Sequence, residues 1–243
     1  MKRSTAIVLL ACALAATSAT RAQQSVVTKM QRTPAPAQVL GAQHRESVER
    51  ALHATNSGDL PRALDLLRPV IAFCDGLLAE KRKLVSVAND GEYTAYVAVS
   101  GDGEPVDWVD MACPEAYNTR AFIAVERKDA AAAFSSLDKA IRLAPYWVDP
   151  LAELGHLLNT TGNPAEGLAR YQAALALVES HPRNRPTHAL VLRGVGYSQV
   201  ELGDLDAAEQ SYRKSLEVEP GNALAQRELE YILEQRKKKA TKP

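Results

Sequence analysis

Aromatic residues are scarce in this chain: tyrosine, phenylalanine and tryptophan together make up 5% of it, although apolar residues as a whole make up 46%. A core with so few rings must be built mainly from alanine and leucine, which are strong helix formers. The charged share of 24% is ordinary for a soluble globular protein. The composition therefore favours a helical domain or a short helical array.

Long apolar runs are also missing. The most apolar stretch, Ile7 to Ala16, has about ten residues, whereas a membrane-spanning helix needs about 20. Two basic residues, Lys2 and Arg3, precede this run, and small residues follow it. We therefore expect residues 1–22 to be a cleaved signal peptide, not a membrane span, and the mature chain to be periplasmic or secreted.

Cys12 lies inside the same run, directly after Leu9, Leu10 and Ala11, in a sequence similar to a lipoprotein signal. The apolar run continues past the cysteine to Ala16. This continuation favours ordinary cleavage over a lipid anchor at Cys12.

An excess of charge of either sign is lacking as well, since 29 basic residues balance 29 acidic ones. Loss of residues 1–22 would remove Lys2, Arg3 and Arg21, which leaves 29 − 3 = 26 basic residues and a net charge of 26 − 29 = −3. A chain with this charge has no global reason to bind nucleic acid.

Cysteine is rare, and beyond Cys12 only Cys74 and Cys113 remain. In an exported chain these two thiols are expected to pair, closing a loop of about 40 residues and contributing roughly 4 kcal/mol on the chain-entropy model. Two buried free thiols are the alternative.

Motifs that carry catalysis or metal binding are absent from the sequence. None of the five histidines stands at a metal-ligand spacing from a cysteine or carboxylate, and no nucleophile elbow or glycine-rich phosphate loop occurs. We therefore predict no catalytic residue, no metal and no cofactor.

Helical repeats are what the chain does contain. Within the last third, apolar and small residues lie three or four positions apart on both sides of a glycine turn, as two packed helix faces require. These residues are Leu192, Val195, Gly196, Gly203, Ala208, Tyr212, Ser215 and Pro220. Gly196 and Ala208 would let the two helices approach closely, Gly203 can adopt the left-handed conformation, and Asp204 is a natural N-cap.

The segment VGYSQVELGDLDAAEQSYRKSLEVEPGN resembles the tetratricopeptide repeat family. Earlier segments repeat the pattern less completely: around Gly162 with a capping-box-like Asn163 and Glu166, and around Tyr117, where Lys128 replaces the turn glycine. The resemblance implies a mainly α fold, a tetratricopeptide-like helical-pair solenoid with a small α/β insert near residues 81–112. Repeats are expected at 114–147, 148–188 with an extended loop, and 189–222.

The remaining segments are assigned by pattern. We expect a flexible linker at 23–43, a degenerate helix pair at 44–80, the small α/β insert at 81–113, and a capping helix with a basic tail at 223–243. In the insert, Leu84 to Ala88 and Val106 to Met111 are predicted strands. Between them, residues 92–100 are expected to form a helix capped by Asp90, with a third strand as the alternative.

The family resemblance also implies a partner-binding groove lined by the first helix of each pair. The matching positions are Asn118, Phe122, Val125, Glu126, His156, Asn159, Arg193, Tyr197, Val200 and Glu201. Packing of Phe122 and Tyr197 against the adjoining repeat is the alternative. The basic clamp with which some members hold C-terminal carboxylates is replaced here by Asn118, Phe122, Glu153, Leu190 and Gly194.

These observations favour an exported scaffold that binds a protein or peptide partner in its groove and is a monomer, because the closing helix covers the end of the array. One alternative is an envelope enzyme with a site in the insert around Tyr93, Asp107 and Trp108. The other is a structural assembly protein.

Overall fold

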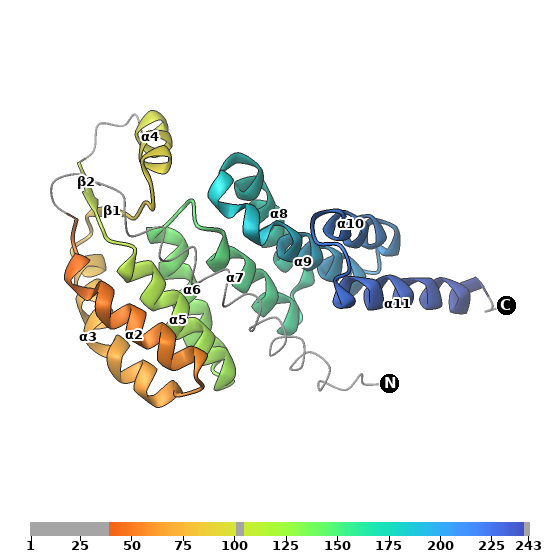
Figure 1. The fold of residues 1–243 in the computed structure, drawn as a ribbon, viewed down its shortest axis with the longest axis horizontal. Helices are drawn as coiled ribbons and strands as arrows, with labels where there is room; N and C mark the ends of the chain where they lie inside the picture. The colour runs from red at the N-terminus through yellow and green to blue at the C-terminus, as the bar shows by residue number, and fades with distance from the viewer. Residues whose placement is uncertain (1–38, 101–104, 241–243) are drawn as a thin grey trace. The chain divides into compact units, whose positions relative to one another are not determined.

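The computed structural model describes residues 39–100 and 105–240. Its elements, in chain order, are η1 (Ala42–His44), α2 (Arg45–Asn56), α3 (Leu60–Ala79), β1 (Lys83–Val85), α4 (Asp90–Val99), β2 (Val106–Trp108), α5 (Ala112–Glu126), α6 (Ala130–Leu143), α7 (Val148–Thr160), α8 (Pro164–Ser180), η2 (Pro182–Thr187), α9 (His188–Glu201), α10 (Leu205–Val218) and α11 (Ala223–Ala240) (Figure 1). The expected signal peptide, residues 1–22, and Cys12 lie outside the described residues.

The chain divides into two compact units within α7, between Leu157 and Leu158. We call the described residues 39–157 the N-terminal unit and 158–240 the C-terminal unit. Each is treated below by itself.

A repeated turn joins the two helices of each pair. The second residue before the second helix is left-handed at Gly58, Lys128 and Gly203, with φ of 80°, 61° and 82°. The aspartate that follows, Asp59, Asp129 or Asp204, accepts a hydrogen bond from a backbone N–H of the first turn at 3.2, 3.0 and 3.1 Å, respectively. This pairing of a left-handed residue with an N-cap ends one helix and starts the next.

The corresponding turn at 162–163 is built differently. Gly162 is left-handed with φ of 86°, as expected. Asn163, however, makes no side-chain cap hydrogen bond, so the predicted capping box with Glu166 does not form. Pro164 and Ala165 occupy the start of α8 instead, and proline is favoured there because its missing N–H has no partner in the first turn of a helix.

The core of the N-terminal unit lies where α2, α3 and α5 pack together. Val48, Ala51, Leu67 and Tyr117 are at most 1% exposed in this core. A second cluster joins α5 and α6 to α7, where Leu154 and Leu157 pack against Ala121 and Leu137. Alanine at the contact points permits the close helix approach that the sequence predicts.

The insert has the predicted order of strand, helix and strand, with different limits. β1 and β2 are parallel, with Leu84 opposite Asp107 and Val85 opposite Trp108. β1 ends at Val85 because Ser86 donates its N–H to Leu143 O at 2.6 Å and leaves the sheet. Asn89, not Asp90, caps α4 by accepting from the Glu92 N–H at 3.0 Å.

The end of the predicted flexible linker is part of this insert, which corrects the assignment for residues 39–43. Leu40 forms a parallel bridge with Val109, donating to Trp108 O at 2.9 Å and accepting from the Asp110 N–H at 2.8 Å. Gly41 follows with φ of 94°, and a Cβ there would lie 3.2 Å from the Phe73 ring. The composition of residues 23–43 could not predict this pairing, because the partner residue lies 69 positions away in the sequence.

Cys74 and Cys113 form a disulfide that joins α3 to the first turn of α5. Each is 1% exposed. The bond ties together the two points at which the chain leaves and re-enters the helix pairs around the insert, as the sequence analysis expects, and the alternative of two free thiols is not what the structure shows.

In the C-terminal unit, α9 packs between α8 and α10, and α10 packs against α11. Two glycines of α9 receive tyrosine rings from the neighbouring helices. A Cβ on Gly194 would overlap the ring of Tyr171, and one on Gly196 would lie 2.9 Å from Cε2 of Tyr212. Gly196 thus has the role that the sequence predicts, and Gly194 has a similar role.

The closing helix covers the end of this unit. Asn222 caps it, since its Oδ1 accepts from the Ala225 N–H at 3.1 Å. Ala225 and Ile232 of α11 are fully buried with Ala208 of α10. The extended loop predicted in the repeat at 148–188 contains the short helix η2, anchored where Asn184 Nδ2 donates to Leu177 O at 3.3 Å.

Candidate partner-binding face

The ten residues predicted to line the groove fall into both units, five in each. Asn118, Phe122 and His156 belong to the N-terminal unit, and Asn159, Arg193 and Tyr197 to the C-terminal unit. The prediction of one continuous groove stays a prediction, and each half is described separately.

In the N-terminal half, Phe122 is the exposed aromatic residue. Its side chain is 37% exposed on α5, whereas Tyr117 one and a half turns earlier is fully buried. Asn118 lies one turn before Phe122 and Glu126 one turn after it, on the same side of the helix. The Oδ1 atom of Asn118 is buried and accepts no hydrogen bond from the described residues.

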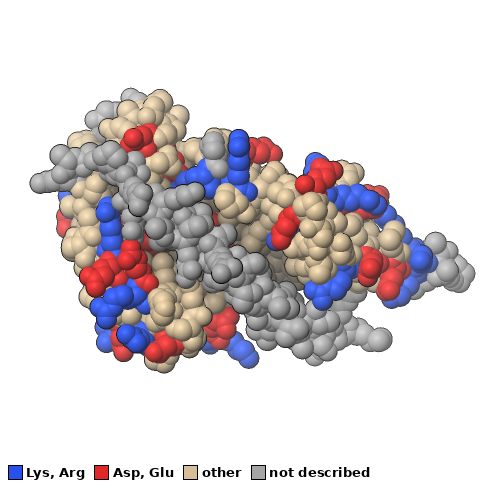
Figure 2. All heavy atoms as spheres, in the orientation of Figure 1, with Lys and Arg blue, Asp and Glu red and all other residues tan. Residues whose placement is uncertain are grey.

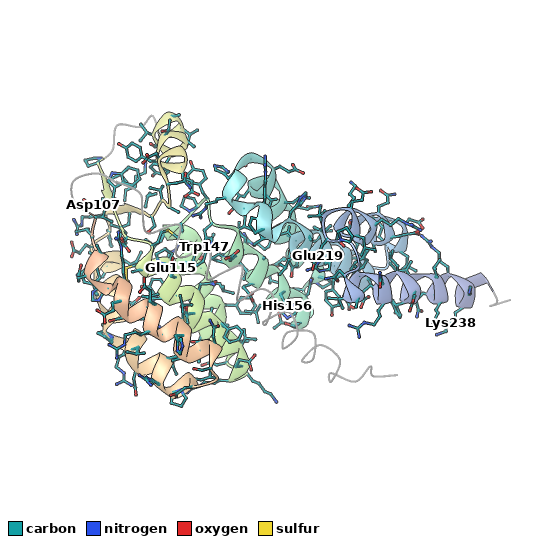
Figure 3. All side chains as sticks on the ribbon, in the orientation of Figure 1. Asp107, Glu115, Trp147, His156, Glu219 and Lys238 are labelled. Carbon is teal, nitrogen blue, oxygen red and sulfur yellow. A yellow bond between two sulfur atoms is a disulfide. The ribbon has the colours of Figure 1, made fainter. Side chains whose placement is uncertain are left out.

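Titratable residues of α7 continue this half. Burial lowers the pKa of His156 below its ordinary value, so the imidazole is neutral near pH 7. The side chain of Glu153 is solvent-exposed, but many protein atoms surround it and reduce the hydration of its carboxylate. This desolvation, followed by the nearby charge of Asp149, raises the pKa of Glu153 to about 7. Figure 3 shows His156 on α7 and Glu115 on α5.

In the C-terminal half, two of the predicted residues have partners inside the unit. Asn159 is 6% exposed and donates from Nδ2 to Ser198 Oγ at 2.8 Å. This burial removes Asn159 from the predicted groove surface. The Arg193 guanidinium, with a side chain 15% exposed, pairs with Glu219 Oε2 at 2.5 Å.

The Arg193 ion pair explains the titration of Glu219, which is labelled in Figure 3. Burial by itself would raise the pKa of Glu219, but hydrogen bonds from Arg193 and Asn222 and the charge of Arg193 lower it overall. Tyr197 is half-buried, and desolvation followed by the charges of Glu201 and Glu228 raises the pKa of its hydroxyl. Of this half, Tyr197 keeps the most freedom to meet a partner.

Comparison with known proteins supports the repeat pattern seen in the helices. Residues 149–218 match the sequence model of the tetratricopeptide repeat family. Residues 149–218 therefore carry tetratricopeptide repeats. No curated protein sequence matches it.

Solved structures of similar fold include pilF of Pseudomonas aeruginosa, with a TM-score of 0.58 and 14% identity over 80% of this chain and 69% of that chain. The first tetratricopeptide domain of Spaghetti (RPAP3), bound to an HSP90 peptide, has a TM-score of 0.46 and 20% identity over 52% of this chain and 95% of that chain. The N-terminal domain of stress-induced protein-1 of C. elegans has a TM-score of 0.46 and 18% identity over 50% and 95%. At these identities the similarity to pilF shows the fold alone. The predicted class, a mainly α solenoid of helix pairs with a small insert, is confirmed.

The insert between the repeats uses the residues of the enzyme alternative for its own packing. The Trp108 ring lies 4.8 Å from that of Tyr93 and 5.8 Å from that of Tyr96, between centroids. Asp107 pairs with Arg82 NH1 at 2.6 Å. Each residue of that alternative therefore has a structural partner.

The described part of the chain contains neither a cluster of metal-ligating side chains nor a membrane-spanning helix. In residues 39–100 and 105–240, no three or more histidine, cysteine, aspartate or glutamate side chains are grouped so as to hold a metal ion. Within the same ranges, none of the helices combines the length and apolar character needed to cross a membrane. Over the visible faces of α2 and α3 and of α10 and α11, acidic and basic side chains lie beside each other (Figure 2).

Glu115 of α5 and Asp149 of α7 were not among the residues predicted from the sequence to line the groove on the first helices of the repeats. The repeat period could have found them, since Glu115 and Asp149 stand 34 residues apart, as do Phe122 and His156. Residues separated by one period occupy equivalent places on successive first helices.

Proposed function

We propose that this chain is an exported tetratricopeptide repeat scaffold that binds a protein or peptide partner through the first helices of its repeats. The observation that supports this best is the 37% exposure of Phe122 on α5. Two other aromatic residues of the repeats, Tyr171 and Tyr212, instead fill spaces between helices, at 5% and 1% exposure. An aromatic ring left in solvent on a rigid helix is the kind of anchor that protein interfaces use.

Photocrosslinking in the native envelope tests the binding role. A photoreactive residue is placed at Phe122, at Trp108 in the insert, or at Ser135, which is exposed on the second helix of the same repeat. A specific adduct at Phe122 and none at Ser135 is expected. Adducts only at Trp108 would transfer the function to the insert, and the absence of any specific adduct would contradict the scaffold role.

Export is a separate part of the proposal, motivated by residues 1–22 and by the Cys74–Cys113 disulfide. Disulfides of this buried, structural kind persist in oxidising compartments. N-terminal sequencing of the chain from fractionated cells should begin at Gln23, in the periplasm or medium. A chain that retains Met1 in the cytosolic fraction would contradict export.

A further inference from the structure

The inner sides of α5 and α7 form one candidate surface within the N-terminal unit. We call it the α5–α7 face and define it by Glu115, Asn118, Phe122 and Glu126 of α5 with Asp149, Glu153 and His156 of α7. α7 packs beside α5 through Leu154 and Leu157. The correspondence of Phe122 with His156, and of Glu115 with Asp149, at one repeat period places the two sets at equivalent positions.

The formal charge of this face is of one sign. Four of its seven residues carry carboxyl groups, of which Glu115 is only 6% exposed and Glu153 has a pKa raised to about 7. Its histidine is neutral near pH 7 because burial lowers its pKa. Neither Glu126 nor Glu153 has a lysine or arginine nitrogen within 4.0 Å among the described residues. Two carboxylates of the face, one of them a helical turn from the exposed Phe122, thus remain available to a positive partner.

Arg45, a cation close enough to this face to interact with the charge of Glu115, is already engaged. Arg45 of α2 pairs with Asp110, whose side chain is 6% exposed, through Nε at 2.8 Å and NH2 at 2.5 Å. The hydrogen bond to Asp110 raises the pKa of Arg45 most, and the charges of Asp110, Glu115 and Glu49 raise it further. Arg45 therefore offsets Asp110 and leaves an excess of negative charge along the face.

The side-chain amide of Asn118 on this face also lacks a hydrogen-bond donor in the described part of the chain. Asn118 Oδ1 is buried one turn from Phe122 and accepts no hydrogen bond from the described residues. An unsatisfied buried acceptor is unfavourable by about 1–3 kcal/mol, which a donor group of a ligand would relieve. Carboxylates and an amide oxygen are all acceptors, and ammonium and guanidinium groups are donors only.

We infer that the α5–α7 face binds a positively charged, extended segment of a partner protein. An apolar side chain of that segment covers Phe122, and its lysine or arginine side chains meet Glu126 and Glu153. This inference rests on the proposed function and adds the chemistry of the partner. Charge complementarity of this kind selects the partner and increases the association rate.

Fluorescence anisotropy with defined peptides tests the inference on the full chain with its disulfide intact. The probe is a labelled nine-residue peptide of alternating leucine and lysine, compared with peptides in which glutamine or glutamate replaces every lysine. The measurements are made at pH 8, above the pKa of about 7 of Glu153. The lysine peptide should bind about tenfold more tightly than the glutamine peptide, with affinity falling as salt is raised.

Matched variants separate local from global charge. Glu126→Gln with Glu153→Gln should lower the affinity for the lysine peptide about tenfold. The control, Asp65→Asn with Asp138→Asn, removes the same charge from exposed residues of the second helices and should change it less than twofold. Phe122→Ser should weaken all peptides without altering the preference for lysine.

Three outcomes would overturn the inference. They are equal binding of the three peptides, equal loss in the two double variants, and tighter probe binding by Lys29→Gln with Arg32→Gln. The last result would assign the face to residues 23–38 of the chain, which contain Lys29 and Arg32 and no acid. A Phe122 photoadduct on an acidic partner segment would refute the charge preference and leave the scaffold role intact.

Discussion

The two units of this chain achieve helix packing by different means. The N-terminal unit departs from the repeat motif, with Lys128 at a turn position that favours glycine and an insert between its helix pairs. It is held by a disulfide and by the buried end of the Arg45–Asp110 pair. The C-terminal unit contains no cysteine and follows the motif closely, with glycines that receive tyrosine rings. Among the described residues, the disulfide thus lies in the unit where the motif is incomplete.

The largest effect expected from this difference is that of the disulfide. Replacing Cys74 and Cys113 together by serine frees a loop of about 40 residues, so the N-terminal unit should lose roughly 4 kcal/mol on the chain-entropy model. Hydrogen exchange resolved by peptide should show reduced protection of the amides in 39–157 and unchanged protection of those in 158–240. Reduction of the unmodified chain is the control, and equal loss in both units would contradict the contrast.

A smaller effect is expected in the C-terminal unit from Gly194→Ala. The added methyl overlaps the Tyr171 ring, which must shift, and overpacking of this kind lowers the free energy of unfolding by about 1–3 kcal/mol. Thermal unfolding and hydrogen exchange of 158–240 measure it.

Gly76→Ala in α3 is the matched control, because a Cβ there meets nothing within 4 Å. It should stabilise the N-terminal unit by about 0.5–1 kcal/mol through the loss of glycine flexibility in a helix. An unchanged free energy of unfolding for Gly194→Ala would show that the close contact of Gly194 with Tyr171 does not stabilise the C-terminal unit.

Exchanging the turn residues of the two units sharpens the comparison further. Lys128 adopts φ of 61° and Gly203 φ of 82° at equivalent turns. Lys128→Gly should raise the stability of the N-terminal unit by about 0.5–1 kcal/mol, and Gly203→Lys should lower that of the C-terminal unit by about 1 kcal/mol, because side chains disfavour this conformation. Denaturant unfolding of both variants measures these changes in the free energy of unfolding. Changes of the same sign in the two variants would contradict the prediction.

Local chemistry explains which features the sequence could predict. The left-handed turn at Gly203 with its Asp204 cap, and the small residue at Gly196, depend on residues close in sequence, and the structure contains all three. The insert was predicted in kind but not in its limits, because the contact of Ser86 with Leu143 sets the end of β1.

Features that depend on distant partners were not predictable in this way. The pairing of Leu40 with Val109, of Asn159 with Ser198 and of Arg193 with Glu219 joins residues 69, 39 and 26 positions apart. Helical periodicity tells which side of a helix a residue occupies, and it does not tell which residue meets it. Two of the predicted groove residues were consequently found in contacts inside the C-terminal unit.

The smallest effect expected concerns one carboxylate in each unit. Burial by itself would raise the pKa of Asp75, but hydrogen bonds from Lys139 at 2.6 Å and Tyr117 at 2.6 Å, and the charge of Lys139, lower it overall. A carboxylate with a lowered folded-state pKa stabilises the fold above its unfolded pKa of about 4, and the contribution disappears as the pH falls through the folded-state value. Because Asp75 is 42% exposed, Asp75→Asn, which keeps an acceptor for Tyr117, should cost less than about 1 kcal/mol at pH 7.

The effect of the same substitution should shrink as the pH falls through the folded-state pKa of Asp75, because the carboxyl group of the unmodified chain then becomes protonated as well. Glu219→Gln provides the counterpart in the C-terminal unit, because the pKa of Glu219 is lowered by the same kind of contact with Arg193. Hydrogen exchange from pH 2 to 7 should therefore locate the loss in 39–157 for Asp75→Asn and in 158–240 for Glu219→Gln. A loss that is independent of pH would show that the ion pairs, unlike the disulfide and the glycine contacts, contribute nothing to the difference between the units.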